Sequence, residues 1–317
     1  MFENKKKPLV ILTGPTAVGK TELSIKLAKV INGEIISADS IQVYKYMDIG
    51  SAKVTPEEMD GIKHYLIDVL EPSEEFNIYV FKKMAMAAMD EIYSKGKIPI
   101  IAGGTGFYIQ SLLYDIEFSE EEGDKTYRRM LEKKAAEEGN AAIHHMLREV
   151  DYKSAEDIHE NNLKRVIRAL EYYHETGCKI SDHNEEQRQK ESPYNFRYYV
   201  LNMDRDKLYD RINMRVDIML DNGLVEEVRK LKNMGFGREL VSQQGIGYKE
   251  IRDYVDGLCT YDEAVDTLKK NTRHFAKRQL TWFKREKEVV WLNHEDFNSD
   301  KEKILEYILN DLHKNIM

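Results

Sequence analysis

The chain has 317 residues, roughly the length of two typical domains, so it holds either two domains or one core with a large insertion. Hydrophobic residues make up 42% of the chain, enough for a sizeable core, and the 33% of charged residues excludes a polytopic membrane protein. The formal net charge of −8 excludes a uniformly basic nucleic-acid-binding surface, so any basic binding face must be local.

Cysteine content and hydropathy indicate in which cellular compartment the protein is expected. The two cysteines, Cys178 and Cys259, are too few for a disulfide framework and indicate a reducing environment. No apolar run approaches the roughly 20 residues of a membrane span, and the run at residues 9–12 is too short for the core of a signal peptide. We therefore expect a cytoplasmic protein with no membrane partner.

Strand and helix patterns alternate in the N-terminal third of the chain. Short apolar runs predict strands over residues 9–13, 34–38 and 98–102, and apolar residues at helical spacing predict helices over residues 21–31 and 76–94. Strands that alternate with helices in this way form parallel βαβ units. The sequence therefore predicts an α/β fold with a parallel sheet.

The pattern changes near residue 117. An acidic run at residues 117–124 opens a helical stretch that continues to Ser192 and Pro193. Residues 196–201 then predict a strand that returns to the sheet, and helical patterns follow to the C-terminus. The expected organisation is an α/β core with C-terminal helices, interrupted by a helical insertion domain. The core is assigned to residues 1–116 and 195–317, and the insertion to residues 117–194.

Residues 14–21 read Gly-Pro-Thr-Ala-Val-Gly-Lys-Thr and fit the P-loop pattern G-x-x-x-x-G-K-[ST], between a predicted strand and a predicted helix. The glycines let backbone N–H groups surround a phosphate, and the following helix adds the positive end of its dipole. Lys20 supplies a positive charge, and the Thr21 hydroxyl is suited to bind Mg²⁺. The motif predicts a P-loop NTPase-like core. Its phosphate- or diphosphate-binding residues are Gly14, Pro15, Thr16, Ala17, Val18, Gly19, Lys20 and Thr21.

The P-loop alone does not identify the phosphate compound. Kinases and hydrolases with this loop usually carry an Asp at the end of a second apolar strand, whereas the strand at residues 98–102 ends in Gly-Gly-Thr-Gly. The segment Tyr-Leu-Ile-Asp at residues 65–68 is only a short substitute. No Asn-Lys-x-Asp tetrad is present to read guanine, which disfavours a GTPase.

Asp39 follows the strand predicted at residues 34–38. Ligands of open α/β sheets bind outside the carboxyl ends of the strands, so Asp39 is expected to face the same cleft as the P-loop. Its carboxylate is suited to act as a general base or to assist Mg²⁺ binding, and equally suited to cap the following turn. Thr105 and Gly106 are expected to line the same cleft, where glycines permit a close approach of the backbone.

Further motifs follow the P-loop in order. They read Ser-Ala-Asp-Ser-Ile-Gln-Val-Tyr at residues 37–44, Met-Asp-Ile-Gly-Ser-Ala-Lys at 47–53, Gly-Gly-Thr-Gly at 103–106, Gly-Leu-Val-Glu-Glu-Val at 223–228, Gly-Ile-Gly-Tyr-Lys-Glu at 245–250 and Ala-Lys-Arg-Gln-Leu-Thr-Trp-Phe at 276–283. Over nearly the whole chain, this ordered series resembles the tRNA dimethylallyltransferase family. Two places depart from the family pattern: residues 159–162 read His-Glu-Asn-Asn instead of His-Pro-Asn-Asp, and Phe107 stands where Leu is common.

The resemblance implies transfer of a dimethylallyl group from dimethylallyl diphosphate to N6 of adenosine 37, beside the tRNA anticodon. In that family the P-loop holds the diphosphate of the donor, which explains why a phosphoryl-transfer Asp is not needed. The position of Asp39 is that of the general base for the attacking amine. The positions implied to contact the anticodon stem-loop of the tRNA are Asp39, Ser40, Ile41, Gln42, Thr105 and Arg128.

Residues 269–287 hold eight Lys and Arg residues and one acidic residue, Glu286, and Trp282 lies among them. A basic helix with interleaved aromatic residues is suited to bind RNA phosphates. The alternatives are a solvated charged face and a core position for Trp282. The residues assigned to tRNA binding in this way are Arg273, Lys277 and Arg278, with Arg165 and Arg168 of the insertion adding phosphate contacts.

The implied reaction needs a stabilised leaving group, a base and the exclusion of water. We assign the catalytic roles to Asp39, Thr16, Lys20 and Arg215, with Mg²⁺ as the cofactor. Arg215 lies one helical turn from Arg211, so both guanidinium groups share a helix face. The alternative for these two arginines is a solvated face paired with Asp210 and Asp217.

Two other functions are compatible with the P-loop. One is a small-molecule kinase that uses ATP, and the other is a nucleotide-gated RNA-binding regulator without covalent chemistry. For the transferase, the expected partners are tRNA and dimethylallyl diphosphate, and the expected state is a monomer.

Overall fold

The computed structural model describes residues 6–116 and 125–316. The chain divides into two compact units, which we describe separately. The core unit comprises Met1–Leu113 and Pro193–Met317, and the insertion unit comprises Tyr114–Ser192. The acidic run at residues 117–124 lies outside the described residues.

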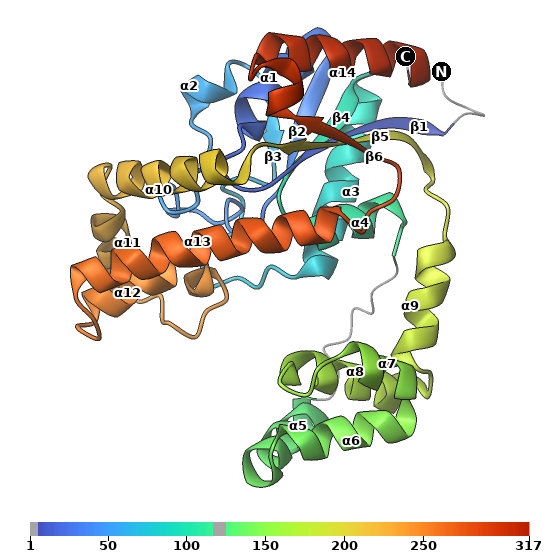
Figure 1. Ribbon diagram of the computed structural model, residues 1–317, viewed down its shortest axis with the longest axis vertical. Helices are drawn as coiled ribbons and strands as arrows, with labels where there is room; N and C mark the ends of the chain where they lie inside the picture. The colour runs from blue at the N-terminus through green and yellow to red at the C-terminus, as the bar shows by residue number, and fades with distance from the viewer. Residues whose placement is uncertain (1–5, 117–124, 317) are drawn as a thin grey trace. The chain divides into compact units, whose positions relative to one another are not determined.

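The core unit contains a parallel sheet, as the alternation of strands and helices predicts (Figure 1). Within the described residues its strand order is β3-β2-β4-β1-β5-β6, and every neighbouring pair is parallel. The strands are β1 (Lys7–Thr13), β2 (Gly33–Ala38), β3 (His64–Tyr65), β4 (Ile98–Gly103), β5 (Tyr194–Asn202) and β6 (Val289–Asn293). Strand β1 lies between β4 and β5, so the P-loop that follows it opens at the middle of the sheet edge.

Two strands are missing from the sequence-based prediction. Residues 289–293 were expected to be helical, which is wrong: they form the edge strand β6 beside β5. Its apolar run Val-Val-Trp-Leu is only four residues long and lies between two helical segments. In so short a run, the spacing of apolar residues does not distinguish a strand from a helix. Strand β3 has two residues and pairs only with β2, which leaves almost no periodic signal.

The helices of the core unit connect and cover these strands. They are α1 (Lys20–Val30), α2 (Pro56–Met59), α3 (Ile78–Ser94), α4 (Gly106–Leu113), α10 (Arg205–Asp221), α11 (Leu224–Asn233), α12 (Tyr248–Val255), α13 (Tyr261–Phe283) and α14 (Lys301–Asn315), with short 3₁₀ turns at Ser242–Gln244 and His294–Phe297. Helices α1 and α14 lie side by side, and α10 to α13 pack together as a group (Figure 1).

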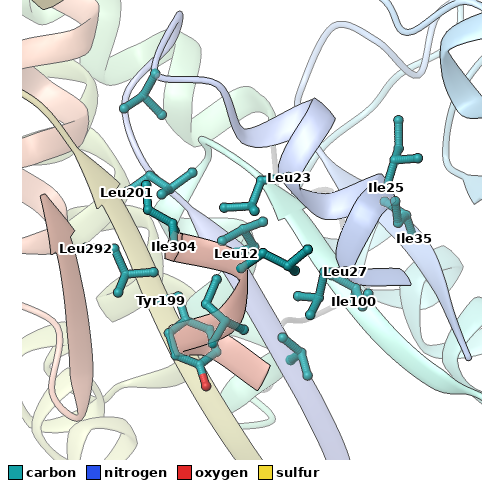
Figure 2. Close-up of a cluster of buried hydrophobic side chains, with 14 of the residues drawn as sticks. Leu12, Leu23, Ile25, Leu27, Ile35, Ile100, Tyr199, Leu201, Leu292 and Ile304 are labelled. Carbon is teal, nitrogen blue, oxygen red and sulfur yellow. The ribbon is translucent and has the colours of Figure 1, made fainter. Parts of the chain in front are cut away.

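One hydrophobic cluster fixes the P-loop in the core unit. The cluster buries residues on either side of the loop: Leu12 of β1 before it, and Leu23 and Leu27 of α1 after it. Figure 2 shows them packed with side chains of β2, β4, β5, β6 and α14, namely Ile35, Ile100, Tyr199, Leu201, Leu292 and Ile304. Both ends of the P-loop are therefore anchored in the core unit.

The insertion unit is helical, with a hydrophobic cluster of its own. Its helices are α5 (Lys125–Glu138), α6 (Asn140–Val150), α7 (Tyr152–Asp157), α8 (Leu163–Thr176) and α9 (Ile180–Gln189). The apolar faces of α5, α6 and α8 meet around Leu131, Ile143, Leu147 and Leu170, all of which are buried. No helix in the described part of either unit is long and apolar enough to cross a membrane.

Candidate active site

The P-loop joins β1 to α1 through backbone conformations that favour glycine. Gly14 and Gly19 have φ angles of +146° and +104°, and Ala17 also has a positive φ of +64°. A Cβ atom on Gly14 would lie 2.4 Å from the Leu201 carbonyl oxygen of β5. The first glycine of the motif is therefore required by the adjacent strand as well as by the turn.

Side chains from two helices hold the carbonyl oxygens of the P-loop. The Lys20 Nζ donates to the carbonyls of Gly14 (2.9 Å) and Pro15 (2.8 Å). The Arg211 Nε of α10 donates to the Ala17 carbonyl at 2.9 Å. These bonds tie the loop to α10 and to its own helix.

Gln279 of α13 joins the P-loop to the end of β4. Its Oε1 accepts from the Thr16 amide at 2.9 Å, and its Nε2 donates to the Gly104 carbonyl at 3.0 Å. A Cβ on Gly104 would lie 2.0 Å from that Nε2. The absence of a side chain at Gly104 thus makes room for Gln279. No role was predicted for Gln279 from the sequence, because its partners lie as far as 263 residues away.

A cavity of the core unit opens beside the P-loop, beyond the ends of β2 and β4. It brings together six of the residues assigned from the sequence, which are Thr16, Lys20, Thr21, Asp39, Gln42 and Arg215. Ser37, Ser51 and Gln279 also line it and were not predicted. Thr105 is half-buried just beyond β4, where its amide donates to the Ala38 carbonyl at 3.2 Å.

Asp39 caps a turn and also faces this cavity. Its Oδ1 accepts from the amides of Ile41 (2.8 Å) and Gln42 (3.3 Å). Among the described residues, none donates a hydrogen bond to its Oδ2. The two roles that the sequence left open are therefore compatible, because one carboxylate oxygen fixes the turn and the other is left for a ligand. Ser40 and Ile41, beside it, are half-buried.

Two half-buried cations accompany the Asp39 carboxylate. Burial and, to a lesser extent, the positive charge of Arg215 lower the pKa of Lys20 to about 7, against the opposing effect of the Asp39 carboxylate. Burial likewise lowers the pKa of Arg215, against the effect of Asp39. Because burial weakens the solvation of both cations, a bound anion would interact with them strongly.

Arg211 and Arg215 share one face of α10, as their spacing predicts. Arg211 contacts the P-loop, and Arg215 lines the cavity one turn further along. Asp217, an acidic neighbour considered for pairing with them, instead forms an ion pair with Lys269 at 2.6 Å. The two arginines therefore extend the positive side of the site.

Comparison with known proteins identifies the family. The family model described as IPP transferase matches residues 42–286. A tRNA dimethylallyltransferase of Lachnoclostridium phytofermentans is 61% identical over 95% of this chain and 96% of its own length, and one of Acetivibrio thermocellus is 54% identical over 95% and 97%. The chain belongs to the IPP transferase family. The resemblance seen in the sequence is confirmed, and the protein is an enzyme of the transferase class.

Solved structures agree with this IPP transferase assignment. The tRNA isopentenylpyrophosphate transferase of Bacillus halodurans is 45% identical, with a TM-score of 0.73 and 98% of each chain covered. A eukaryotic dimethylallyltransferase, described as acting on tRNA, is 29% identical, with a TM-score of 0.83 over 98% of this chain and 80% of its own. The predicted P-loop NTPase-like fold is confirmed.

In the predicted basic segment of this IPP transferase, some residues bond to neighbouring side chains and others are exposed to solvent. Arg273 donates to the Asn213 Oδ1 of α10 at 2.6 Å, so it ties two helices together. Lys277 and Arg278 are exposed. Trp282 packs on Gly106, where a Cβ would lie 2.1 Å from its ring, and meets the ring of Phe107 edge-on. Packing thus accounts for Trp282 and for the glycine at position 106.

The arginines assigned in the insertion unit also differ in their surroundings. Arg128 forms a bidentate pair with Glu171, with Nε and one terminal nitrogen 2.8 and 2.7 Å from the carboxylate oxygens. Glu171 is buried, so Arg128 neutralises a buried charge in this unit. Arg165 and Arg168 of α8 are exposed.

The site has too few protein oxygens to bind a divalent cation without further oxygens from a bound substrate or water. No group of three or more His, Cys, Asp and Glu side chains in residues 6–116 and 125–316 is arranged to hold a metal ion. Among the oxygens that line the cavity, the Thr21 hydroxyl and the Asp39 carboxylate are the ones suited to a divalent cation. Mg²⁺ is commonly bound by few protein ligands together with substrate phosphates and water, and these residues fit that arrangement.

Proposed function

We propose that the protein transfers the dimethylallyl group of dimethylallyl diphosphate to N6 of adenosine 37 in tRNA and releases diphosphate. The observation that carries the proposal is the cavity in which Lys20 and Arg215 lie with the Asp39 carboxylate beside the P-loop. Such a site matches a substrate pair made of an anionic leaving group and an amine that must lose a proton. The tRNA named for the relatives supplies the acceptor.

The reaction is a displacement at the allylic carbon of the donor. The N6 amine attacks that carbon, a C–N bond forms, and the C–O bond to the diphosphate breaks with its electron pair on the leaving oxygen. The proton lost from N6 passes to Asp39, whose Oδ2 is left open by the turn. General-base help of this kind is typically worth about 10²–10⁴ in rate.

The leaving diphosphate gathers charge at the P-loop. Lys20, Arg215 and amides of the loop other than that of Thr16 would stabilise it, and the Thr16 hydroxyl is available as a further donor. The Thr21 hydroxyl would hold Mg²⁺ together with diphosphate oxygens, and a bound Mg²⁺ would neutralise part of the leaving charge. Before the substrate binds, Lys20 donates to the Gly14 and Pro15 carbonyls, so it would exchange these bonds for contacts with the diphosphate.

Acceptor binding is assigned to two groups of residues in the core unit. Ser40, Ile41, Gln42 and Thr105 lie near Asp39, at the ends of β2 and β4, and are suited to contact the extruded adenosine. The exposed Lys277 and Arg278 of α13 are suited to bind RNA phosphates. Arg165 and Arg168 add exposed positive charge in the insertion unit.

The kinase and the regulator are less well supported. A kinase of this fold needs a second carboxylate for Mg²⁺, and β4 ends in glycines packed against Ala38, Gln279 and Trp282 rather than in an acid. A regulator without covalent chemistry would need no general base beside the P-loop, where Asp39 lies. Membership of a transferase family favours the transfer reaction over both.

The test is transfer of labelled dimethylallyl diphosphate to unmodified tRNA, with ATP as the alternative donor. Label in the tRNA at adenosine 37 is expected, and Asp39→Asn is expected to lower the turnover by about 10²-fold or more with tRNA affinity within a few-fold. ATP turnover without label transfer would favour the kinase. Near-full turnover by Asp39→Asn would remove the base role.

A further inference from the structure

The loop formed by residues 47–52 supports the turn that holds Asp39. The Gln42 amide follows Asp39 in this turn and donates to its Oδ1. The side-chain amide of Gln42 reaches across to the loop, where its Nε2 donates to the carbonyls of Ser51 and Ala52, both at 3.3 Å. Its Oε1 accepts from the Ser37 hydroxyl at 3.1 Å. The position of the loop therefore affects the position of the Asp39 turn.

A single carboxylate fixes that loop. Glu227 of α11 accepts from three successive backbone amides: Asp48 (3.0 Å) and Ile49 (2.9 Å) at its Oε2, and Gly50 (3.1 Å) at its Oε1. Its Oε1 also accepts from the Tyr248 hydroxyl of α12 at 2.8 Å. Hydrogen bonds to a charged acceptor are about twice as strong as neutral ones, so this arrangement gives the loop one well-defined position.

The Tyr248 ring closes the other side of the loop. Tyr248 is fully buried, and a Cβ on Gly50 would lie 2.7 Å from its Cζ. Gly50 thus lies between the Tyr248 ring, which leaves no room for a Cβ, and the Glu227 carboxylate, which accepts from its amide. Helices α11 and α12 thereby clamp a loop that lies next to the cavity through Ser51.

We propose that Glu227 is a positioning residue for the transfer reaction: it holds residues 48–50 so that Ser51 and Ala52 orient Gln42, and Gln42 in turn sets the turn of Asp39. The inference rests on the proposed function, because it concerns the base of that reaction. Glu227 itself lines no part of the cavity. Its effect is expected on the amine side of the site, since the P-loop is held by other residues.

Replacing Glu227 by Gln should displace the loop, because an NH₂ group then faces backbone or hydroxyl donors. A displacement of about 1 Å in a reacting group commonly lowers a rate by about 10²-fold. We expect the kcat of Glu227→Gln to fall at least about tenfold, with the KM for dimethylallyl diphosphate within about twofold of the wild type. A purely structural role would instead lower the melting temperature and leave the kcat per folded molecule unchanged.

Glu226→Gln is the matched control, because Glu226 is the adjacent residue of α11 and pairs with exposed Arg229. It should behave as the wild type. Two milder variants test the same clamp where Glu227→Gln fails to fold: Tyr248→Phe removes one donor, and Gly50→Ala places a Cβ against the Tyr248 ring. Both should lower kcat with the donor KM unchanged.

The outcomes separate the two proposals. If the wild type and Glu226→Gln transfer no label to tRNA, the proposed function fails and this inference fails with it. If they transfer label and Glu227→Gln keeps a kcat within about twofold of theirs, only the positioning role is overturned. A donor KM that rises in parallel with the loss of kcat also overturns it, because the damage would then extend to the P-loop.

Discussion

The surroundings of Lys20 predict that the site depends on pH. Its ammonium group donates to two P-loop carbonyls, yet burial and Arg215 bring its pKa down to about 7. The group therefore changes charge near neutral pH instead of above pH 10. The cationic form, present below the shifted pKa, is the one that attracts a diphosphate.

Donor binding should consequently weaken as pH rises. Between about pH 6.5 and pH 8.5 the cationic fraction of Lys20 falls steeply, so the Kd for dimethylallyl diphosphate should rise by about tenfold. Titration calorimetry of the wild type and of Lys20→Arg measures this directly. The arginine stays charged over the whole range, so its profile reports the titration of the diphosphate alone. Equal profiles for the two proteins would contradict the lowered pKa.

The sequence identifies the residues of the site that belong to local motifs. Lys20 and Thr21 come from the P-loop pattern, and Asp39 from its place after a strand. Gln279 and Glu227 could not be assigned in this way, because the groups they hold lie in loops 263 and as many as 179 residues away along the chain. Only folding brings such partners together, and one sequence carries no record of the pairing.

At the scale of elements, local periodicity predicts α1, α3, β1, β2 and β4 well, since each has a clear apolar pattern. It does not predict β6 or which residues of α13 face inward. In α13 the buried face holds Ala276, Gln279 and Phe283, while Lys277 and Arg278 on the other face are exposed. The same helix thus contributes one face to the site and offers another to solvent.

We predict that the exposed face of α13 binds tRNA. Replacing Lys277 and Arg278 together by Ala should weaken tRNA binding and reduce the slope of log K against log salt by about two, because two phosphate contacts are lost. Filter binding at several salt concentrations measures the slope. Lys303→Ala, which removes an exposed charge from α14, is the control. An unchanged slope in the double variant would exclude this face from the RNA interface.

At the scale of the whole molecule, two of the hydrophobic clusters formed by the described residues lie in different units. One lies under the P-loop and spans both halves of the core unit, and the other lies among α5, α6 and α8 of the insertion unit. The change in pattern near residue 117 predicts a helical insertion over residues 117–194, because a helical stretch without strand runs cannot extend the sheet. Each cluster has its own set of buried side chains, so each should respond to its own mutations.

Leu147→Ala should therefore loosen the insertion unit alone. Leu147 is fully buried among the residues of the second cluster, and truncating such a side chain typically costs about 2–5 kcal/mol. Hydrogen exchange should show faster exchange of amides in α5, α6 and α8, with β1 and β4 protected as in the wild type. The reciprocal variant Leu12→Ala, in the first cluster, should reverse the pattern. If Leu147→Ala lowered the protection of β1 to the same extent, the two units would unfold as one, and the clusters would not be energetically separate.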